Sequence, residues 1–273
     1  MEERNNTMIT LDILKYGKRH CVTTSWDDGN ANDRPLIEMF NKYGIKGTFH
    51  LNSGHYARPD NAIRGEELPT LYAGHEIACH GVRHSSMTYL DPTAIYHEIF
   101  ADRIALEGYA GYPVRGLSYA NGKYTEDNLA PLAACGIVYS RTTKDTRRYE
   151  FPTNFLEWHP TTHQRNAVPQ AEDFMHAIDG YYSGPKLLYV WGHSHEFERM
   201  VKWSEIEQFC RMVSGNEKIW YATNIEIYDY MQAQRALVLS ADHTMVYNPS
   251  AMEVWFSCDG EICSVKPGEM WKK

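Results

Sequence analysis

Two neighbouring carboxylates, Asp27 and Asp28, follow the first apolar stretch of the chain, and Gly29 comes directly after them. The stretch 21–25 is predicted to be a strand, and neighbouring side chains in an extended segment point to different sides. Two partly buried carboxylates repel each other, so such a pair needs a cation or a proton nearby. Asp-Asp-Gly is also a common exposed turn, so the pair alone does not indicate a site; the histidines described next are needed for that interpretation.

Imidazoles follow two further predicted strands. His80 and His84 have i, i+4 spacing, which on a helical turn puts both rings on one face, about 5–6 Å apart at Cβ. Two imidazoles at that separation can share a metal such as zinc, at nitrogen–metal distances of about 2.0–2.1 Å. The apolar stretch 187–191 leads to His193, and histidine is the usual general acid or base near neutral pH. Each of these histidines alone fits a structural role equally well.

These side chains together predict a hydrolase. One carboxylate and two imidazoles form a three-ligand metal site that keeps a position open for water, as catalytic zinc sites do. A spare carboxylate beside that site can take a proton from the water. A separate histidine can give a proton to a leaving group.

The elements around these residues alternate between strand and helix about seven times. This alternation predicts a parallel sheet, either a βα barrel or a doubly wound sheet, and functional groups in such folds collect where strands end. The predicted strands are 21–25, 45–51, 76–79, 114–118, 137–140, 187–191 and 219–222. The predicted helices are 35–43, 92–106, 126–135, 171–182, 203–213 and 224–233.

The last part of the chain has a different pattern, with short apolar runs separated by turn residues. We therefore expect two parts, a catalytic domain over residues 1–235 and a small β-rich appendage over residues 236–273. The predicted strands of the appendage are 236–240, 245–247, 252–257 and 262–265. A packing role is the more plausible interpretation of this appendage than a binding module.

Composition excludes several classes of protein. The 273 residues carry a net charge of −8, which is unfavourable for general nucleic-acid binding because phosphate contacts need a basic surface. No apolar run approaches the roughly 18–20 residues of a membrane span. The six cysteines form no CxxC pair, so we expect reduced thiols. With a polar start and no apolar signal core, the sequence favours a cytoplasmic protein.

The order of these motifs resembles the polysaccharide deacetylases of the NodB-homology type, carbohydrate esterase family 4. The family's first motif, T-F-D-D-G, is matched by residues 25–29 with Trp in place of Phe, and its second, H-S/T-x-x-H, by residues 80–84 with Gly in place of the hydroxyl residue. Its last motif, an apolar strand leading to a histidine, is similar to residues 188–193. The likeness extends over about residues 20–235.

The resemblance implies an irregular (β/α)7 barrel, which is TIM-barrel-like, and a role for each site residue. Asp27 would be the base that activates water, and His193 the acid that protonates the leaving group, with His195 as a competitor for that role. The implied metal is zinc, with cobalt, nickel or iron as alternatives. Its ligands would be Asp28, His80 and His84.

One family feature is missing. The third motif, R-x-P-x-G-like, aligns with residues 117–122, and Ser118 stands where the family has an arginine that supports the base. Arg115 or Arg141 are the candidates for a spatial replacement.

The predicted reaction is metal-dependent removal of N- or O-linked acetyl groups from a carbohydrate. Tyr119, Trp158 and Trp191 are expected to offer apolar faces to a sugar ring, and the backbone N–H of Tyr119 to stabilise the oxyanion. The alternatives are a hydrolase of cyclic amides, imides or ureides on the same fold, and a sugar-binding relative without activity.

Overall fold

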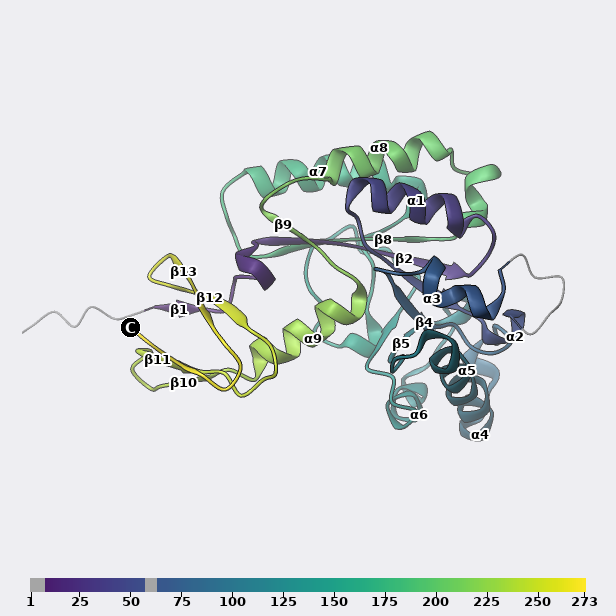
Figure 1. The fold of residues 1–273 in the computed structure, drawn as a ribbon, viewed down its shortest axis with the longest axis horizontal. Coiled ribbons are helices and arrows are strands. Elements are labelled where there is room, and N and C mark those ends of the chain that lie inside the picture. The colour runs from purple at the N-terminus through teal and green to yellow at the C-terminus, as the bar shows by residue number, and fades with distance from the viewer. Residues whose placement is uncertain (1–7, 57–62) are drawn as a thin grey trace, which may run out of the picture.

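A curled parallel sheet forms the centre of the computed structural model, which describes residues 8–56 and 63–273 (Figure 1). The strand order is β6-β5-β4-β3-β2-β8-β7, and β9 pairs with the first part of β2. All these pairings are parallel, which confirms the predicted irregular α/β barrel. The strands are β2 (His20–Asp28), β3 (Gly47–Leu51), β4 (Glu76–Cys79), β5 (Gly116–Ser118), β6 (Tyr139–Arg141), β7 (Thr162–His163), β8 (Lys186–Gly192) and β9 (Ile219–Tyr221).

A segment over residues 158–163, which ends in the short strand β7, bridges the two sides of the barrel. Trp158 exchanges backbone hydrogen bonds with residues at the end of β6, at 2.9 and 3.0 Å. The backbone N–H of Thr161 donates to the carbonyl of Tyr189 in β8 at 2.9 Å. The sequence offered no alternating pattern for this segment, and it was not predicted as a strand.

Helices cover the outside of the sheet. In Figure 1, α1, α7 and α8 lie together on one side of the sheet, and α9 lies on the other side, toward the C-terminal strands. The predicted helix 92–106 extends to Ala110, and a π-helical turn at Tyr96–Phe100 joins its two parts, α4 and α5. The helices are α1 (Asp33–Tyr43), α2 (Ser53–Tyr56), α3 (Leu68–Leu71), α4 (Pro92–Ile95), α5 (Ala101–Ala110), α6 (Leu129–Ala134), α7 (Ala167–Asp179), α8 (Trp203–Val213) and α9 (Asn224–Arg235).

The two faces of the strands differ in chemistry. Trp26 of β2 packs outward against Phe40 of α1, with ring centroids 5.7 Å apart. Its neighbour Asp27 is buried on the opposite face, beside Arg141 of β6. Strand alternation therefore separates an apolar layer under the helices from a polar barrel interior.

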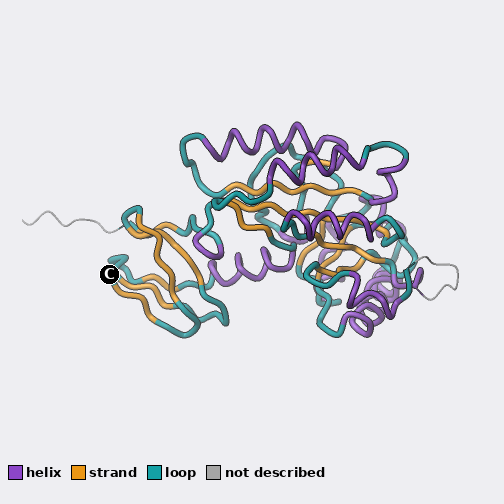
Figure 2. Tube along the Cα trace, turned by 45° about the horizontal axis from the view of Figure 1, so that its top comes forward, coloured by secondary structure: helices purple, strands orange, loops and turns teal. Residues whose placement is uncertain are grey.

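Two small antiparallel sheets form the C-terminal appendage, which Figure 2 shows as a group of strands beside the main sheet. Their orders are β1-β12-β13 and β10-β11-β14. The N-terminal strand β1 pairs with β12, so the appendage also includes residues from the predicted 1–235 part. These strands are β1 (Ile9–Thr10), β10 (Val238–Leu239), β11 (Met245–Tyr247), β12 (Val254–Cys258), β13 (Glu261–Val265) and β14 (Met270–Lys272).

The appendage shares an apolar cluster with α9 and the barrel. Tyr230 of α9 accepts a hydrogen bond from the backbone N–H of Trp255 at 3.0 Å. Within the residues that the structure describes, no helix is both long enough and apolar enough to cross a bilayer.

Candidate active site

The end of β2 carries both predicted carboxylates. Asp27 is 3% exposed, whereas Asp28 is half-buried and has a left-handed backbone with φ of 79°. Few non-glycine residues adopt this conformation. It turns the strand so that the two carboxylates approach the same imidazole: Asp27 Oδ2 lies 3.9 Å and Asp28 Oδ1 3.5 Å from His80 Nε2. Simple strand alternation had predicted that they would point to different sides.

His80 and His84 converge through a loop, so the predicted helical turn is wrong. Gly81 and His84 have φ of 86° and 59°, and the two imidazole rings lie 4.7 Å apart between centroids. Two buried carboxylates hold the loop. Asp102 accepts the backbone N–H groups of His80 and Gly81, at 3.1 and 2.9 Å, and Glu98 accepts those of the two residues that flank His84.

The donor atoms of Asp28, His80 and His84 fit a divalent cation. Asp28 Oδ1 lies 3.5 Å from His80 Nε2 and 3.6 Å from His84 Nε2, close to the spacing of about 3.3 Å for tetrahedral ligands at 2.0–2.1 Å. His80 Nδ1 lies 2.6 Å from Ser118 Oγ and 3.0 Å from the Ser118 carbonyl, so we assign the proton to Nδ1. Nε2 is buried without a hydrogen-bond partner among the described residues, which leaves its lone pair for a metal.

Arg141 supports the predicted base. Its guanidinium donates to Asp27 Oδ2, and Ser118 Oγ donates to Asp27 Oδ1 at 3.0 Å. Burial opposes ionisation of Asp27, but Arg141 and the neighbouring histidines together outweigh it and hold the pKa of this carboxyl well below its usual range. Of the two candidate replacements for the missing arginine, Arg115 instead pairs with Asp229 at 2.6 Å. Ser118, at the position of that arginine, links the base to His80.

His193, and not His195, faces the predicted base. His193 Nε2 lies 3.9 Å from Asp27 Oδ2, and its Nδ1 lies 3.2 Å from Glu196 Oε1. Burial opposes protonation of His193, but Glu196 and then Asp27 outweigh it and raise its pKa. His195 Nδ1 lies 4.0 Å from Asp28 Oδ2, and burial lowers its pKa. Glu196 was not predicted as a site residue, although a carboxylate three residues after His193 was a usable signal.

Glu196 is the centre of a hydrogen-bonded clamp around His193. The second oxygen of Glu196 lies 3.4 Å from His163 Nε2 and accepts the side-chain amide of Gln164 at 2.8 Å. His163 Nδ1 accepts from the backbone N–H and the Nε–H of Arg165, so we assign its proton to Nε2. His163, His193 and Glu196 have the spacing of a metal site, but this tautomer leaves His163 no lone pair for an ion there.

Two of the three predicted sugar contacts do not fit the structure. Tyr119 and Trp158 are 0% and 1% exposed, so their rings offer no face to a sugar. The backbone N–H of Tyr119 donates to the Arg141 carbonyl at 3.0 Å, which occupies the predicted oxyanion donor. Trp191 lines a cavity of about 390 Å³ together with His193, and it remains a candidate contact.

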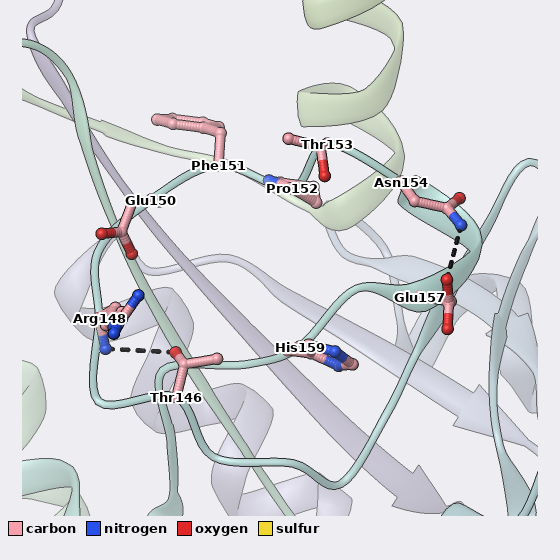
Figure 3. Close-up of a pocket in the computed structure, with 9 residues that line it drawn as sticks. All are labelled: Thr146, Arg148, Glu150, Phe151, Pro152, Thr153, Asn154, Glu157 and His159. Atoms are coloured by element: carbon pink, nitrogen blue, oxygen red, sulfur yellow. Dashed lines mark hydrogen bonds between the residues drawn. The ribbon is translucent and has the colours of Figure 1, made fainter.

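A second cavity, of about 460 Å³, opens along the loop between β6 and β7 (Figure 3). None of the predicted catalytic or metal-binding residues lines it. Its Glu157 carboxylate already accepts the side chains of Asn154 and Tyr124, at 2.9 and 3.0 Å. We therefore assign the chemistry to the rim around Asp27 and not to this cavity.

The fold and this rim define a barrel hydrolase, and comparisons agree with that class. Residues 15–140 match the sequence model of the family described as Polysaccharide deacetylase. The match covers these residues alone, just under half of the chain, and supports a hydrolase that acts on amide or ester bonds. No match is found among curated proteins.

Solved structures share the fold at low identity. A protein from Mycobacterium smegmatis described as a polysaccharide deacetylase is 18% identical, with 84% of this chain and 96% of that chain covered and a TM-score of 0.58. A family 4 acetyl xylan esterase from Clostridium thermocellum, in complex with a cobalt ion, is 17% identical (76% and 90% covered, TM-score 0.51). Puue allantoinase is 14% identical (77% and 88% covered, TM-score 0.58).

Proposed function

We propose that this protein is a metal-dependent hydrolase that removes N- or O-linked acetyl groups from a carbohydrate. The observation that carries the proposal is the convergence of Asp28, His80 and His84 on one point, with His80 Nε2 buried and unpartnered among the described residues. Asp27 and His193 flank that point, and each has its own charged support.

Asp28, His80 and His84 would hold the cation. When bound, a divalent ion supplies a Lewis acid that polarises a carbonyl and acidifies water. One carboxylate and two imidazoles suit zinc, and cobalt, nickel or iron(II) are alternatives for the same ligands. Ser118 keeps the His80 ring in the tautomer that such binding requires.

Asp27 and His193 would divide the proton transfers. Asp27 is kept ionised by Arg141, so it can accept the proton of the attacking water at neutral pH. His193 has a raised pKa, and its Nδ1 lies 3.2 Å from Glu196 Oε1, so its Nε2–H can protonate the leaving nitrogen or oxygen. These roles require His193 to be protonated and Asp27 to be ionised at the same pH.

Acetate release is the direct test. We expect purified protein loaded with zinc or cobalt to release acetate from chito-oligosaccharides or acetylated xylan, and a chelator to abolish the release until metal is added back. Metal-loaded protein that releases no acetate from any acetylated glycan would remove the substrate assignment.

A second candidate is hydrolysis of a small cyclic amide, imide or ureide. It is supported by the cavity beside His193, whose wall includes the polar side chains of Asp145, Arg165 and Asn166, and by the burial of two predicted sugar contacts. This candidate predicts turnover of hydantoin-like or allantoin-like rings and none of glycans. If metal-loaded protein turned over neither glycans nor cyclic substrates, the result would favour a sugar-binding protein without activity.

A further inference from the structure

A buried carboxylate connects the loops that carry the predicted base and acid. Asp33 begins α1, directly after the turn that follows Asp28, and it is 0% exposed. Its Oδ1 accepts the hydroxyl of Ser194 at 2.5 Å, and its Oδ2 accepts the hydroxyl of Tyr72 at 2.7 Å. Ser194 is also 0% exposed and lies between His193 and His195.

The loop 193–196, which we call the acid loop, is held from two directions. On one side, the Gln164 amide donates to the His193 carbonyl at 3.0 Å and to Glu196 at 2.8 Å. On the other side, Ser194 donates to Asp33 of α1. This helix follows β2, the strand that carries Asp27 and Asp28. The Ser194–Asp33 hydrogen bond therefore fixes the acid loop relative to Asp27.

Packing alone does not call for a carboxylate at this position. Burying an ionisable group costs free energy unless its oxygens are hydrogen-bonded, and an apolar residue avoids that cost. Burial raises the pKa of Asp33 to about 7, even though the Ser194 and Tyr72 hydroxyls favour the ionised form. A carboxyl with both oxygens engaged gives a directional link that an apolar contact lacks.

We propose that Asp33 and Ser194 are positioning residues, which hold His193 at proton-transfer distance from the leaving group by tying the acid loop to α1. The proposal rests on the proposed function, because it needs His193 to act as the acid. A displacement of about 1 Å in a reacting group can lower a rate by roughly 100-fold, so a single buried hydrogen bond is sufficient to matter.

Two substrates that differ in their need for an acid provide the test. An N-acetyl chito-oligosaccharide must have its leaving amine protonated, whereas 4-nitrophenyl acetate loses a stable phenolate without a proton. We expect Ser194→Ala to lower kcat for the oligosaccharide by about 10- to 100-fold, with KM little changed and a much smaller loss on 4-nitrophenyl acetate. Asp33→Ala should show the same selective loss.

Asp33→Asn serves as the conservative rescue of Asp33→Ala, because its amide can donate to Ser194 while its carbonyl oxygen accepts from Tyr72. Tyr72→Phe is the matched control, since it removes the Tyr72 hydrogen bond to Asp33 and leaves the acid loop untouched. We expect Tyr72→Phe and Ser194→Ala to lower Tm by similar amounts, and only Ser194→Ala to change the ratio of the two activities.

Two contrary results are distinguishable. A Ser194→Ala variant with the wild-type ratio of oligosaccharide to aryl ester turnover, or a Tyr72→Phe variant with an equally altered ratio, would overturn the positioning role and leave the proposed function standing. Metal-loaded wild-type protein with no turnover of either substrate would overturn both proposals.

Discussion

Two buried carboxyl groups at opposite ends of the barrel have pKa values shifted in opposite directions. Glu76, at the start of β4, is 4% exposed, and burial raises its pKa to about 7 although Tyr139, Thr48 and the backbone N–H of Ile225 all donate to it. Asp27, at the end of β2, is 3% exposed, yet its pKa lies well below the usual range. Burial is nearly equal, so hydrogen bonds alone do not keep a carboxylate charged here.

The difference between the two ends is a cation. Arg141 contacts Asp27 directly, whereas the groups that contact Glu76 are neutral donors. The carboxyl end also leaves His80 Nε2 without a partner among the described residues. At the amino end, neutral groups satisfy the Glu76 carboxyl, whereas the carboxyl end holds a charge on Asp27 and an open lone pair on His80.

Replacing the charged carboxylate at the reactive end should have the largest effect. We expect Asp27→Asn to keep its metal and lose about 10²- to 10⁴-fold in kcat, because an amide cannot accept the proton from water. Elemental analysis and acetate release measure the two quantities. His84→Ala should lose both metal and turnover. Glu76→Gln is the matched control at the amino end, and full activity in Asp27→Asn would contradict the base assignment.

Removing the Arg141 guanidinium should raise the pKa of Asp27, so that this carboxyl resembles Glu76. We expect Arg141→Met to lower the free energy of unfolding by about 3–5 kcal/mol at pH 7, because a buried charge is left unpaired. Without Arg141, burial should raise the pKa of Asp27. The loss of stability should therefore be smaller near pH 4, where the carboxyl can protonate. Urea denaturation at both pH values measures this.

The matched control is Arg115→Met, which breaks the half-exposed pair with Asp229. Such a pair contributes about 1 kcal/mol or less. If Arg115→Met and Arg141→Met lost equal stability at pH 7, the contrast between the two ends of the barrel would not depend on the buried ion pair.

Because of Glu76, the free energy of unfolding should fall as pH rises from about 4.5 to about 7. Its folded-state pKa is about 7 against an ordinary value of 4.5, so the folded protein binds more protons between those values and each unit of rising pH favours unfolding. We expect Glu76→Gln to remove this contribution and to gain roughly 2 kcal/mol relative to wild type between pH 5 and pH 8. Unfolding curves with an equal stability difference at both pH values would argue against a protonated Glu76.

The sequence allowed prediction of much of this architecture, because each central strand is apolar or flanked by turn signals. The predicted strand 76–79 and helix 203–213 agree with the structure at both ends. Asp27, Asp28, His80 and His84 were found because their residue types carry chemistry at short spacing. Their convergence depends on left-handed backbone at Asp28 and His84, which residue types do not reveal.

Long-range pairings lay outside the reach of the sequence. Arg141 was one of two candidates for the missing arginine, but it is 114 residues from Asp27 and nothing local selects it over Arg115. Ser194 is 161 residues from Asp33, and nothing local identifies it as a partner. Tyr119 and Trp158 were predicted as surface contacts because an aromatic residue near a strand end fits either the rim or the core. The segment that carries Trp158 has no strand periodicity, and its inward face could not be read from the sequence.

The smallest expected effect concerns the alkaline limit of activity. Glu196 is the main group that raises the pKa of His193 against the effect of burial. A histidine that must donate a proton is active below its pKa, so kcat should fall as pH rises through that value. Glu196→Gln keeps the size of the side chain and removes its charge, so the alkaline limb of the kcat profile should move to lower pH.

The measurement is kcat for an N-acetyl oligosaccharide across the alkaline range, with metal content checked at each pH. Glu157→Gln, in the cavity away from the predicted catalytic residues, is the control and should leave the limb in place. A limb that stays unmoved in Glu196→Gln would mean that a group other than His193 limits activity at high pH. The carboxyl end of the barrel would then keep its base but lose its assigned acid.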